Sequence, residues 1–572
     1  MRFGLFYEHQ LPRPWSDGAE ERLLQNALEQ VELADRLGFD YVWEVEHHFL
    51  EEYSHSSAPE IFLAAASQRT KRIRLGHGIV QLPPTFNHPV RVAERIATLD
   101  LISGGRVEFG TGESSSQMEL GGFGIPREEK RKQWREALDA ITRMFVEEPF
   151  AGYDGEFISV PQRNVIPKPK QKPHPPLWAA CSQRDTILLA ARNGIGALSF
   201  SFVDPEAAKE WVDAYYELIV SDECVPAGFE VNPNFAVVVP LMCHEDEDTA
   251  IQQGIDGGHF FGYSLAHYYV FGEHHPGRTD VWDEFEKHRS EYGFAREIIR
   301  AQDGEIGVKV LEGGLGSMRG AIGTPNQIAD LVRRYEAAGV DQIIFVAQCG
   351  NNVHEQVCAS LELFGREVLP RFAAEADAKE AAKKERLGDA IAEAMTRREG
   401  PRAAADYLVT PKGEDAPSAG YVLPGVSGDA PARPAPARQT EVFGALVRHL
   451  NDDQIEDVFG SEKGSAPIFE GMAASFNPEG AMGFVGKIQY RLGSNGSAVE
   501  WYVDVDKEKA VAAPGVAERP ALTIEASVAD FVRIAAGVLN GAKAAMEGKL
   551  RFEGELDLAL RLQRMFGGDS LY

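Results

Sequence analysis

The first 370 residues alternate between strand-like and helix-like segments, and this repeat constrains the fold more than any other feature. Eight apolar runs read as strands, and most are followed by an amphipathic stretch that reads as a helix. The runs are residues 3–7, 39–45, 73–80, 106–110, 175–182, 196–202, 234–243 and 341–349. Repeated βα units imply a parallel sheet, and about eight of them fit a closed (β/α)₈ TIM barrel. Periodicity alone leaves a doubly wound open sheet as the alternative.

The composition changes after the repeat ends. We expect a barrel over residues 1–372 and a charged, Ala-rich helix leading into a Pro/Ala-rich linker over residues 373–437. Residues 438–572 then read as strands followed by helices, which predicts an α+β domain with an antiparallel sheet.

Charge and cysteine content narrow the function classes. With 58 Lys and Arg against 87 Asp and Glu, the net charge is −29, which disfavours binding to nucleic acid. No apolar run is long enough for a membrane span, and the N-terminus reads as a strand and not as a signal peptide. The 5 cysteines form no CxxC pair, so we expect no metal site, no disulfide framework and a cytoplasmic location.

Candidate site residues stand where the strands end, because a barrel carries its active site there. His47 and His48 follow the second strand, and one of them could serve as an acid or base. Gly78 and Ile79 end the third strand, where glycine permits close approach to a flat ligand. For the histidine pair, a purely structural role remains the alternative.

Two further strand ends carry possible phosphate donors. The Gly/Ser loop after the fourth strand offers Ser114, Ser115 and Ser116, although it matches no Walker motif. After the fifth strand, Cys181 and Ser182 are counted among the expected cofactor-binding residues. Ser182 could instead cap the following helix, and Cys181 could be a buried bystander.

The stretch 255–320 is longer than a normal connection. It reads either as a lid over the site or as additional surface structure. It contains His267, His274 and His275, but no Asp or Cys stands at ligand spacing, so a metal site there is disfavoured.

Residues 39–49, 74–112, 175–198 and 322–345 together resemble the bacterial luciferase-like flavin monooxygenases, and HPVRVAERIATLDLISGGR is the most specific segment. The resemblance implies a homodimeric TIM barrel that uses reduced FMN, supplied by a separate flavin reductase, and molecular oxygen to oxidise a small-molecule substrate. It also implies that the insertion is a mobile active-site loop.

The resemblance carries over unevenly to single residues. His47 and His48 match the catalytic histidine pair of the family, Gly78–Ile79 matches a non-proline cis peptide beneath the flavin, and Arg131 and Ser182 match phosphate ligands. Glu113 departs from the pattern, because it stands where luciferases place another phosphate-binding arginine. A carboxylate there would repel a phosphate, so it must turn away or serve another role.

The region from about residue 440 to about residue 570 resembles a sterol carrier protein type 2 domain. The resemblance is carried by the segments GKIQYRL and VADF, the latter followed by AAMEGKLRFEGELDLAL. This implies a tunnel for lipids or acyl groups, so the domain could present a hydrophobic or carrier-bound substrate, or only mediate dimer contacts. The leading hypothesis is a flavin-dependent monooxygenase. The alternatives are a deazaflavin-dependent dehydrogenase on the same barrel and a non-catalytic lipid-binding protein.

Overall fold

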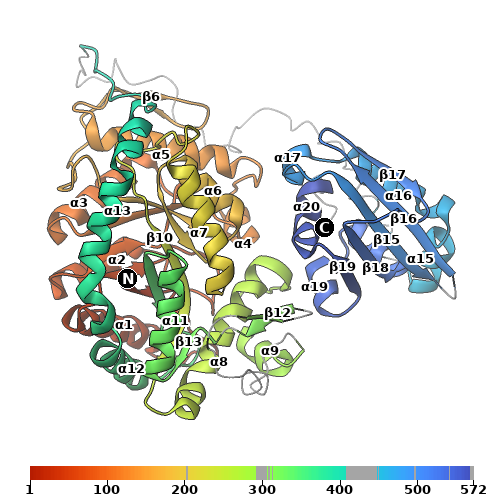
Figure 1. The fold of residues 1–572 in the computed structure, drawn as a ribbon, viewed down its shortest axis with the longest axis horizontal. Coiled ribbons are helices and arrows are strands. Elements are labelled where there is room, and N and C mark those ends of the chain that lie inside the picture. The colour runs from red at the N-terminus through yellow and green to blue at the C-terminus, as the bar shows by residue number, and fades with distance from the viewer. Residues whose placement is uncertain are drawn as a thin grey trace. The chain divides into compact units, whose positions relative to one another are not determined.

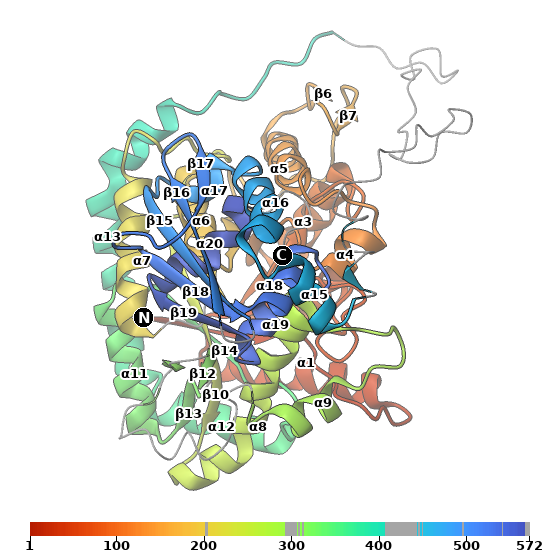
Figure 2. The same ribbon diagram turned by 90° about the vertical axis from the view of Figure 1, so that its right-hand side faces the viewer.

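The computed structural model describes residues 1–200, 204–291, 306, 309–311, 314–317, 319–406, 443, 447–448, 450–494, 497–539 and 541–566. The chain divides into two compact units, Met1–Val426 and Ser427–Tyr572 (Figures 1 and 2).

The first unit is built around a closed barrel of eight parallel strands. They are β1 (Arg2–Tyr7), β2 (Tyr41–Glu44), β3 (Arg74–His77), β5 (Val107–Gly112), β8 (Leu177–Cys181), β9 (Gly196–Ser199), β10 (Phe235–Cys243) and β14 (Gln342–Val346). The ring closes because β9 pairs with β10, β10 with β14 and β14 with β1. The expected (β/α)₈ barrel is therefore confirmed, and the open sheet is excluded.

Helices cover the outside of the barrel (Figure 1). They are α1 (Ala19–Leu37), α2 (Pro59–Arg69), α3 (Pro89–Ser103), α5 (Lys130–Val146), α6 (Arg184–Arg192), α7 (Pro205–Ile219), α8 (Glu247–Ala266), α11 (Pro325–Ala337) and α12 (His354–Glu367). Capping residues in the local sequence determine where several of these helices begin. Asp204 accepts a hydrogen bond from the Ala207 amide, and Thr324 and Gln327 form a capping box.

The barrel is filled near the amino ends of its strands. The indole of Trp43 packs edge-on against Trp178, whose Nε1 donates to Glu108 at 2.6 Å. Gly76 is required beside Trp43, because a Cβ there would lie 2.3 Å from the indole. Below this layer runs α13 (Pro370–Thr396), whose Lys383 Nζ lies 2.7 Å from Asp341. A ligand must therefore enter at the opposite, carboxyl ends of the strands.

The remaining elements of the first unit are connections. A short hairpin is formed by β6 (Tyr153–Asp154) and β7 (Ser159–Val160). The strand β4 (Val80–Gln81) and the short α4 (Gln117–Gly122) lie at the barrel mouth. The insertion after α8 contains a π-helix, η1 (His267–Phe271), then α9 (Val281–His288) and the short strands β11 (Lys309–Leu311), β12 (Gly314–Ser317) and β13 (Ala321–Gly323). Much of 292–318 lies outside the described residues.

The second unit holds one five-stranded sheet in the order β17–β16–β15–β18–β19. Its strands are β15 (Gly486–Ser494), β16 (Ser497–Val505), β17 (Ala510–Pro514), β18 (Leu522–Ser527) and β19 (Leu550–Gly554). The expected antiparallel sheet is wrong in one place, because β15 and β18 pair in parallel. After β17 at the edge, the chain crosses over to the free side of β15, and the crossover keeps β18 running in the same direction as β17 and β15.

In the described part of this unit, six helices accompany the sheet: α15 (Asp452–Phe459), α16 (Glu462–Ala474), α17 (Pro478–Ala481), α18 (Val528–Ala535), α19 (Gly541–Met546) and α20 (Leu556–Phe566). Their core includes Phe469, which stacks on Trp501 and on Phe531. The Pro-rich part of the expected linker, residues 407–437, lies outside the described residues, whereas α13 belongs to the first unit. No helix in the described part of the chain is long and apolar enough to cross a bilayer.

Candidate active site

His47 lies just beyond β2 with a carboxylate near each ring nitrogen. Its Nδ1 is 3.0 Å from Glu119 Oε1, and its Nε2 is 3.6 Å from Glu8 Oε2. Burial alone would lower the pKa of His47, but the charges of Glu119 and Glu8 outweigh burial and raise it to about 9. The imidazole is therefore cationic at neutral pH.

The carboxylates of Glu119 and Glu8 differ in the hydrogen bonds that they accept. Glu119 also accepts from the His48 amide at 2.9 Å and from Ser114 Oγ at 2.7 Å. Burial would raise the pKa of Glu119, but His47 and these donors hold it below its usual value. Glu8 accepts one hydrogen bond, from Tyr53 at 2.8 Å, and burial raises its pKa to about 7 despite the opposing effects of His47 and Tyr53.

His48 is directed to a different set of partners, as expected for adjacent residues. Its Nε2 is 3.2 Å from Glu46, and its ring packs against Phe86 and Phe123. The geometry thus separates the pair: His47 lies between Glu119 and Glu8, whereas His48 pairs with Glu46 beside an aromatic cluster.

The insertion reaches this site through η1. Tyr269 Oη lies 3.4 Å from His47 Nδ1, and the phenol is buried, so its pKa lies well above the usual value. π-Helical turns are often found at functional sites. Tyr269, Glu8, Glu119 and Tyr53 were all missed by sequence reasoning. Only Glu8 carried a signal, because it directly follows the first strand.

The Gly78–Ile79 peptide differs from the expectation. The cis bonds among the described residues all precede proline, so the bond between Gly78 and Ile79 is trans. The Gly78 amide, which belongs to the preceding His77–Gly78 peptide, donates to the Glu44 carbonyl at 2.7 Å. The Ile79 side chain lies over Gly112, where a Cβ would come within 2.3 Å of it.

The three expected serines have separate environments. Ser114 has a φ of 59° and donates to Glu119, and Ser116 caps α4 by accepting from the Met118 amide. Ser115 is exposed. Two of these hydroxyls are therefore engaged within the protein, and Ser115 is the one that faces solvent.

Arg131 is paired with the residue that departs from the family pattern. Its Nε and Nη2 donate to the two oxygens of Glu113, and Lys130 Nζ lies 3.4 Å from the same carboxylate. Burial would raise the pKa of Glu113, but Arg131 and Lys130 hold it below its usual value. Glu113 thus turns toward these cations. Together, Arg131, Lys130 and Glu113 carry one net positive charge.

Cys181 and Ser182 lie at the turn from β8 to α6. Cys181 is buried, and burial raises the pKa of its thiol to about 12, so it is not an activated nucleophile. Ser182 is exposed, and the capping box of α6 is formed by Gln183 and Thr186. Capping by Ser182 is therefore wrong, since the helix begins one residue later than expected.

The insertion histidines contact each other and nearby acids. His267 Nε2 lies 3.3 Å from His274 Nδ1, and His274 Nε2 lies 3.2 Å from Glu51, whereas the His275 amide donates to Thr279. Within the described residues, no group of three or more His, Cys, Asp or Glu side chains is placed to hold a metal ion.

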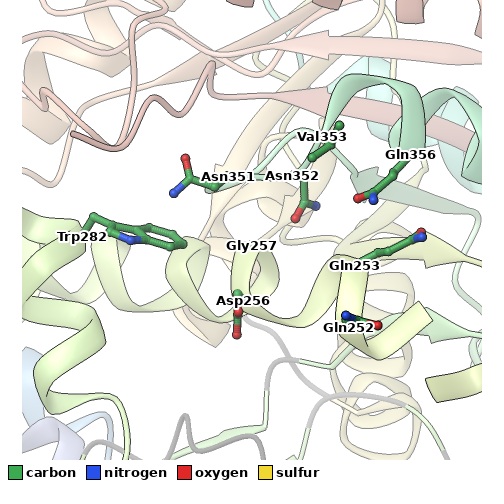
Figure 3. Close-up of a pocket in the computed structure, with 9 residues that line it drawn as sticks. All are labelled: Gln252, Gln253, Asp256, Gly257, Trp282, Asn351, Asn352, Val353 and Gln356. Atoms are coloured by element: carbon green, nitrogen blue, oxygen red, sulfur yellow. The ribbon is translucent and has the colours of Figure 1, made fainter. Parts of the chain in front are cut away.

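A cavity of about 470 Å³ lies beside the loop that follows β14 (Figure 3). Its wall is rich in carboxamides and includes one indole; the lining residues are Gln252, Gln253, Asp256, Gly257, Trp282, Asn351, Asn352, Val353 and Gln356. Because none of the expected site residues lines it, this cavity is distinct from the histidine site at the barrel mouth.

The fold and the histidine site agree with the comparisons to known proteins. The chain belongs to the luciferase-like monooxygenase family, whose model matches residues 1–342. Residues 476–567 match the model of the SCP-2 sterol transfer family. The expected fusion of these two families is therefore confirmed.

Individual relatives give the same class. The chain is 24% identical over 376 residues to the oxygenase component of the flavin-dependent trigonelline monooxygenase of Acinetobacter baylyi, which covers 65% of this chain and 96% of that protein. It is 35% identical over 176 residues to the uncharacterised protein y4wF of Sinorhizobium fredii, across 31% of this chain and 50% of that protein. The crystal structure of the monooxygenase RslO1 from Streptomyces bottropensis superposes with a TM-score of 0.51 at 26% identity, covering 65% of this chain and 100% of that one. These relatives support an oxidoreductase of the flavin-dependent monooxygenase class.

The residues present fit a flavin mononucleotide. Arg131 lies near the start of α6, where its charge acts on Cys181 and Asp185, and its Nη1 is not taken by Glu113. Ser182 adds an exposed hydroxyl at the same turn, so a phosphate can be bound there. Gln81 Oε1 is buried without a hydrogen-bond partner among the described residues, which suits a ring N–H.

Proposed function

We propose that this protein is a monooxygenase that uses reduced FMN, supplied by a separate flavin reductase, and molecular oxygen to oxidise a small hydrophobic or carrier-bound organic substrate. One observation carries the proposal. A half-buried imidazole between two carboxylates and a group formed by Arg131, Lys130 and the Ser182 hydroxyl stand at the same end of one barrel. The first provides a proton at the reacting centre, and the second provides charge for a phosphate tail.

Each residue then has a defined task. Arg131, Lys130 and Ser182 would bind the phosphate, and Ile79, fixed over Gly112, would support the ring. The aromatic side chains of Phe123, Phe86 and Tyr269 would keep water from the site. His47 would hold a proton at Nε2. When bound, reduced FMN supplies the electrons that activate oxygen.

The second unit is proposed to bind an apolar substrate or its acyl carrier. Support comes from the SCP-2 match over residues 476–567 and from an apolar interior that includes Phe469, Phe531 and Trp501. On this view the unit raises the local concentration of a poorly water-soluble substrate near the enzyme. Contacts in the expected homodimer are the other role that the unit could have.

The test is a binding series followed by oxygen uptake. The full-length protein is titrated with FMN, riboflavin and a deazaflavin cofactor, each oxidised and reduced, and flavin fluorescence is followed. We expect FMN to bind more tightly than riboflavin, because only FMN carries the phosphate. Oxygen consumption coupled to product formation supports the proposal.

Two outcomes contradict it. Deazaflavin-dependent turnover that continues without oxygen would indicate the dehydrogenase alternative. Failure to bind any flavin, together with binding of fatty ligands, would indicate a lipid-binding protein. Replacing His47 with Ala is expected to reduce turnover, while leaving the binding of FMN relative to riboflavin unchanged.

A further inference from the structure

We propose that Glu8, His47 and Glu119 form one proton-exchange unit, in which Glu119 positions the imidazole through Nδ1 and Glu8 exchanges a proton with Nε2. The inference rests on the proposed function, since it concerns the proton that His47 would hold at that site.

Glu119 is built to remain an anion. It is fully buried, yet its two oxygens accept from three donors: His47 Nδ1, the His48 amide and Ser114 Oγ. Three donors stabilise the charged form, so Glu119 has little tendency to take up a proton. Its contact with Nδ1 fixes the orientation of the ring and directs Nε2 toward Glu8. Glu119 is therefore a positioning residue.

Glu8 is built to change its charge. It is also buried, but it accepts from Tyr53 alone, and its second oxygen, Oε2, has no hydrogen-bond partner among the described residues. That oxygen lies 3.6 Å from His47 Nε2, which is longer than a hydrogen bond and short enough for a small side-chain movement to form one. A poorly satisfied buried carboxylate readily accepts a proton, and the pKa of Glu8 is accordingly raised to about 7.

Four further side chains, from β2, the segment after it and η1, surround the unit. Tyr53 follows β2, Tyr269 belongs to η1, Glu46 lies on the same segment as His47, and Glu44 of β2 faces Glu8. The two tyrosines remain neutral at physiological pH, because burial raises the pKa of each phenol well above its usual value. The charge of Glu46 favours the cationic imidazole, whereas the charge of Glu44 favours the protonated form of Glu8.

The exchange is balanced. The Nε2–H bond of the imidazolium breaks, an O–H bond forms on Glu8 Oε2, and the products are a neutral imidazole and a neutral carboxylic acid. The reverse step recharges His47. The pair thus keeps one proton available near neutral pH while Glu119 stays anionic.

The experiment is a histidine titration of the full-length chain. Histidine is labelled with ¹³C at Cε1, and the His47 signal is assigned by its loss in the His47→Gln variant. We expect His47 in the parent protein to titrate clearly above the usual 6.5. In the Glu119→Gln variant the pKa of His47 is expected to fall by about one to three units, and in the Glu8→Gln variant by a smaller amount.

Two further variants sharpen the result. Tyr53→Phe removes the hydroxyl that donates to the Glu8 carboxylate and is expected to make Glu8 harder to ionise, which lowers the pKa of His47 slightly. Glu128→Gln removes an exposed carboxylate elsewhere and is expected to leave the titration unchanged. A His47 titration near 6.5 in the parent, or one unaffected by both Glu8→Gln and Glu119→Gln, overturns the proposal.

A second readout separates this inference from the proposed function. The rate of oxygen-dependent reoxidation of bound reduced FMN is measured against pH, and its alkaline limb is expected to shift downward in Glu119→Gln. If His47 titrates high but no flavin is bound, the proton-exchange unit stands and the flavin assignment fails. If flavin is bound and turned over while His47 titrates near 6.5, the flavin assignment stands and the proton-exchange unit fails.

Discussion

Arg131 donates two hydrogen bonds to Glu113, from Nε at 2.6 Å and from Nη2 at 2.8 Å. Lys130 Nζ lies 3.4 Å from the same carboxylate, so the three side chains together carry one net positive charge.

The first prediction concerns that pair. Glu113→Gln frees the guanidinium of Arg131, and the affinity for FMN should rise about threefold to tenfold, because a partly exposed ion pair is worth roughly 1 kcal/mol. Fluorescence titration with FMN measures the change, and riboflavin, which lacks the phosphate, should show none. The exposed Glu128→Gln serves as the matched control. An equal gain for riboflavin would show that the pair does not act on the phosphate.

The second prediction concerns pH and stability. The pKa of His47 is raised in the folded protein to about 9, so this residue stabilises the fold fully below its unfolded pKa of about 6.5 and loses that contribution as pH rises through 9. His47→Gln should therefore reduce the loss of unfolding free energy between pH 7 and 9, by about 1 kcal/mol or more. Urea unfolding at several pH values, monitored at the barrel transition, provides the measurement. Parallel pH profiles for parent and variant would contradict it.

A third prediction tests the packing of the barrel interior. In Gly76→Ala the new methyl group would lie 2.3 Å from the Trp43 indole, and overpacking of this kind costs about 1 to 3 kcal/mol. The urea concentration at the midpoint of barrel unfolding should therefore be lower in Gly76→Ala than in the parent protein. Gly121→Ala in α4 is the control, because a Cβ there meets nothing within 4 Å and alanine favours a helix. Equal stability of the two variants would argue against the tight Trp43 contact.

The fourth prediction addresses the core of the second unit. Phe469 stacks on Trp501 at 4.9 Å and on Phe531 at 5.1 Å, so Phe469→Ala should destabilise that unit by about 3 to 5 kcal/mol. The fluorescence of Trp501 during urea unfolding reports it, while the barrel transition should stay in place. Val516→Ala, at an exposed position, should change little. A shift of both transitions together would mean that the units do not unfold independently.

The barrel could be predicted from the sequence because each strand is a short, continuous apolar run flanked by a helix with local capping residues such as Asp204 and Thr324. The parallel pairing of β18 with β15 could not, because strand direction depends on a crossover and not on local composition. Likewise, Glu119 and His47 are 72 residues apart, and only the closed barrel brings α4 beside the end of β2. The trans Gly78–Ile79 bond corrects an expectation taken from resemblance alone.

The helix beneath the barrel also determines where the chain can be shortened. Lys383 of α13 binds Asp341, Arg398 binds Asp139 of α5, and the Arg402 amide donates to Glu147. Truncation at residue 372 would strip these cations from three acidic side chains and uncover Phe3 and Phe372. A fragment that contains the barrel alone must therefore extend about thirty residues beyond 372, so that it includes Arg402.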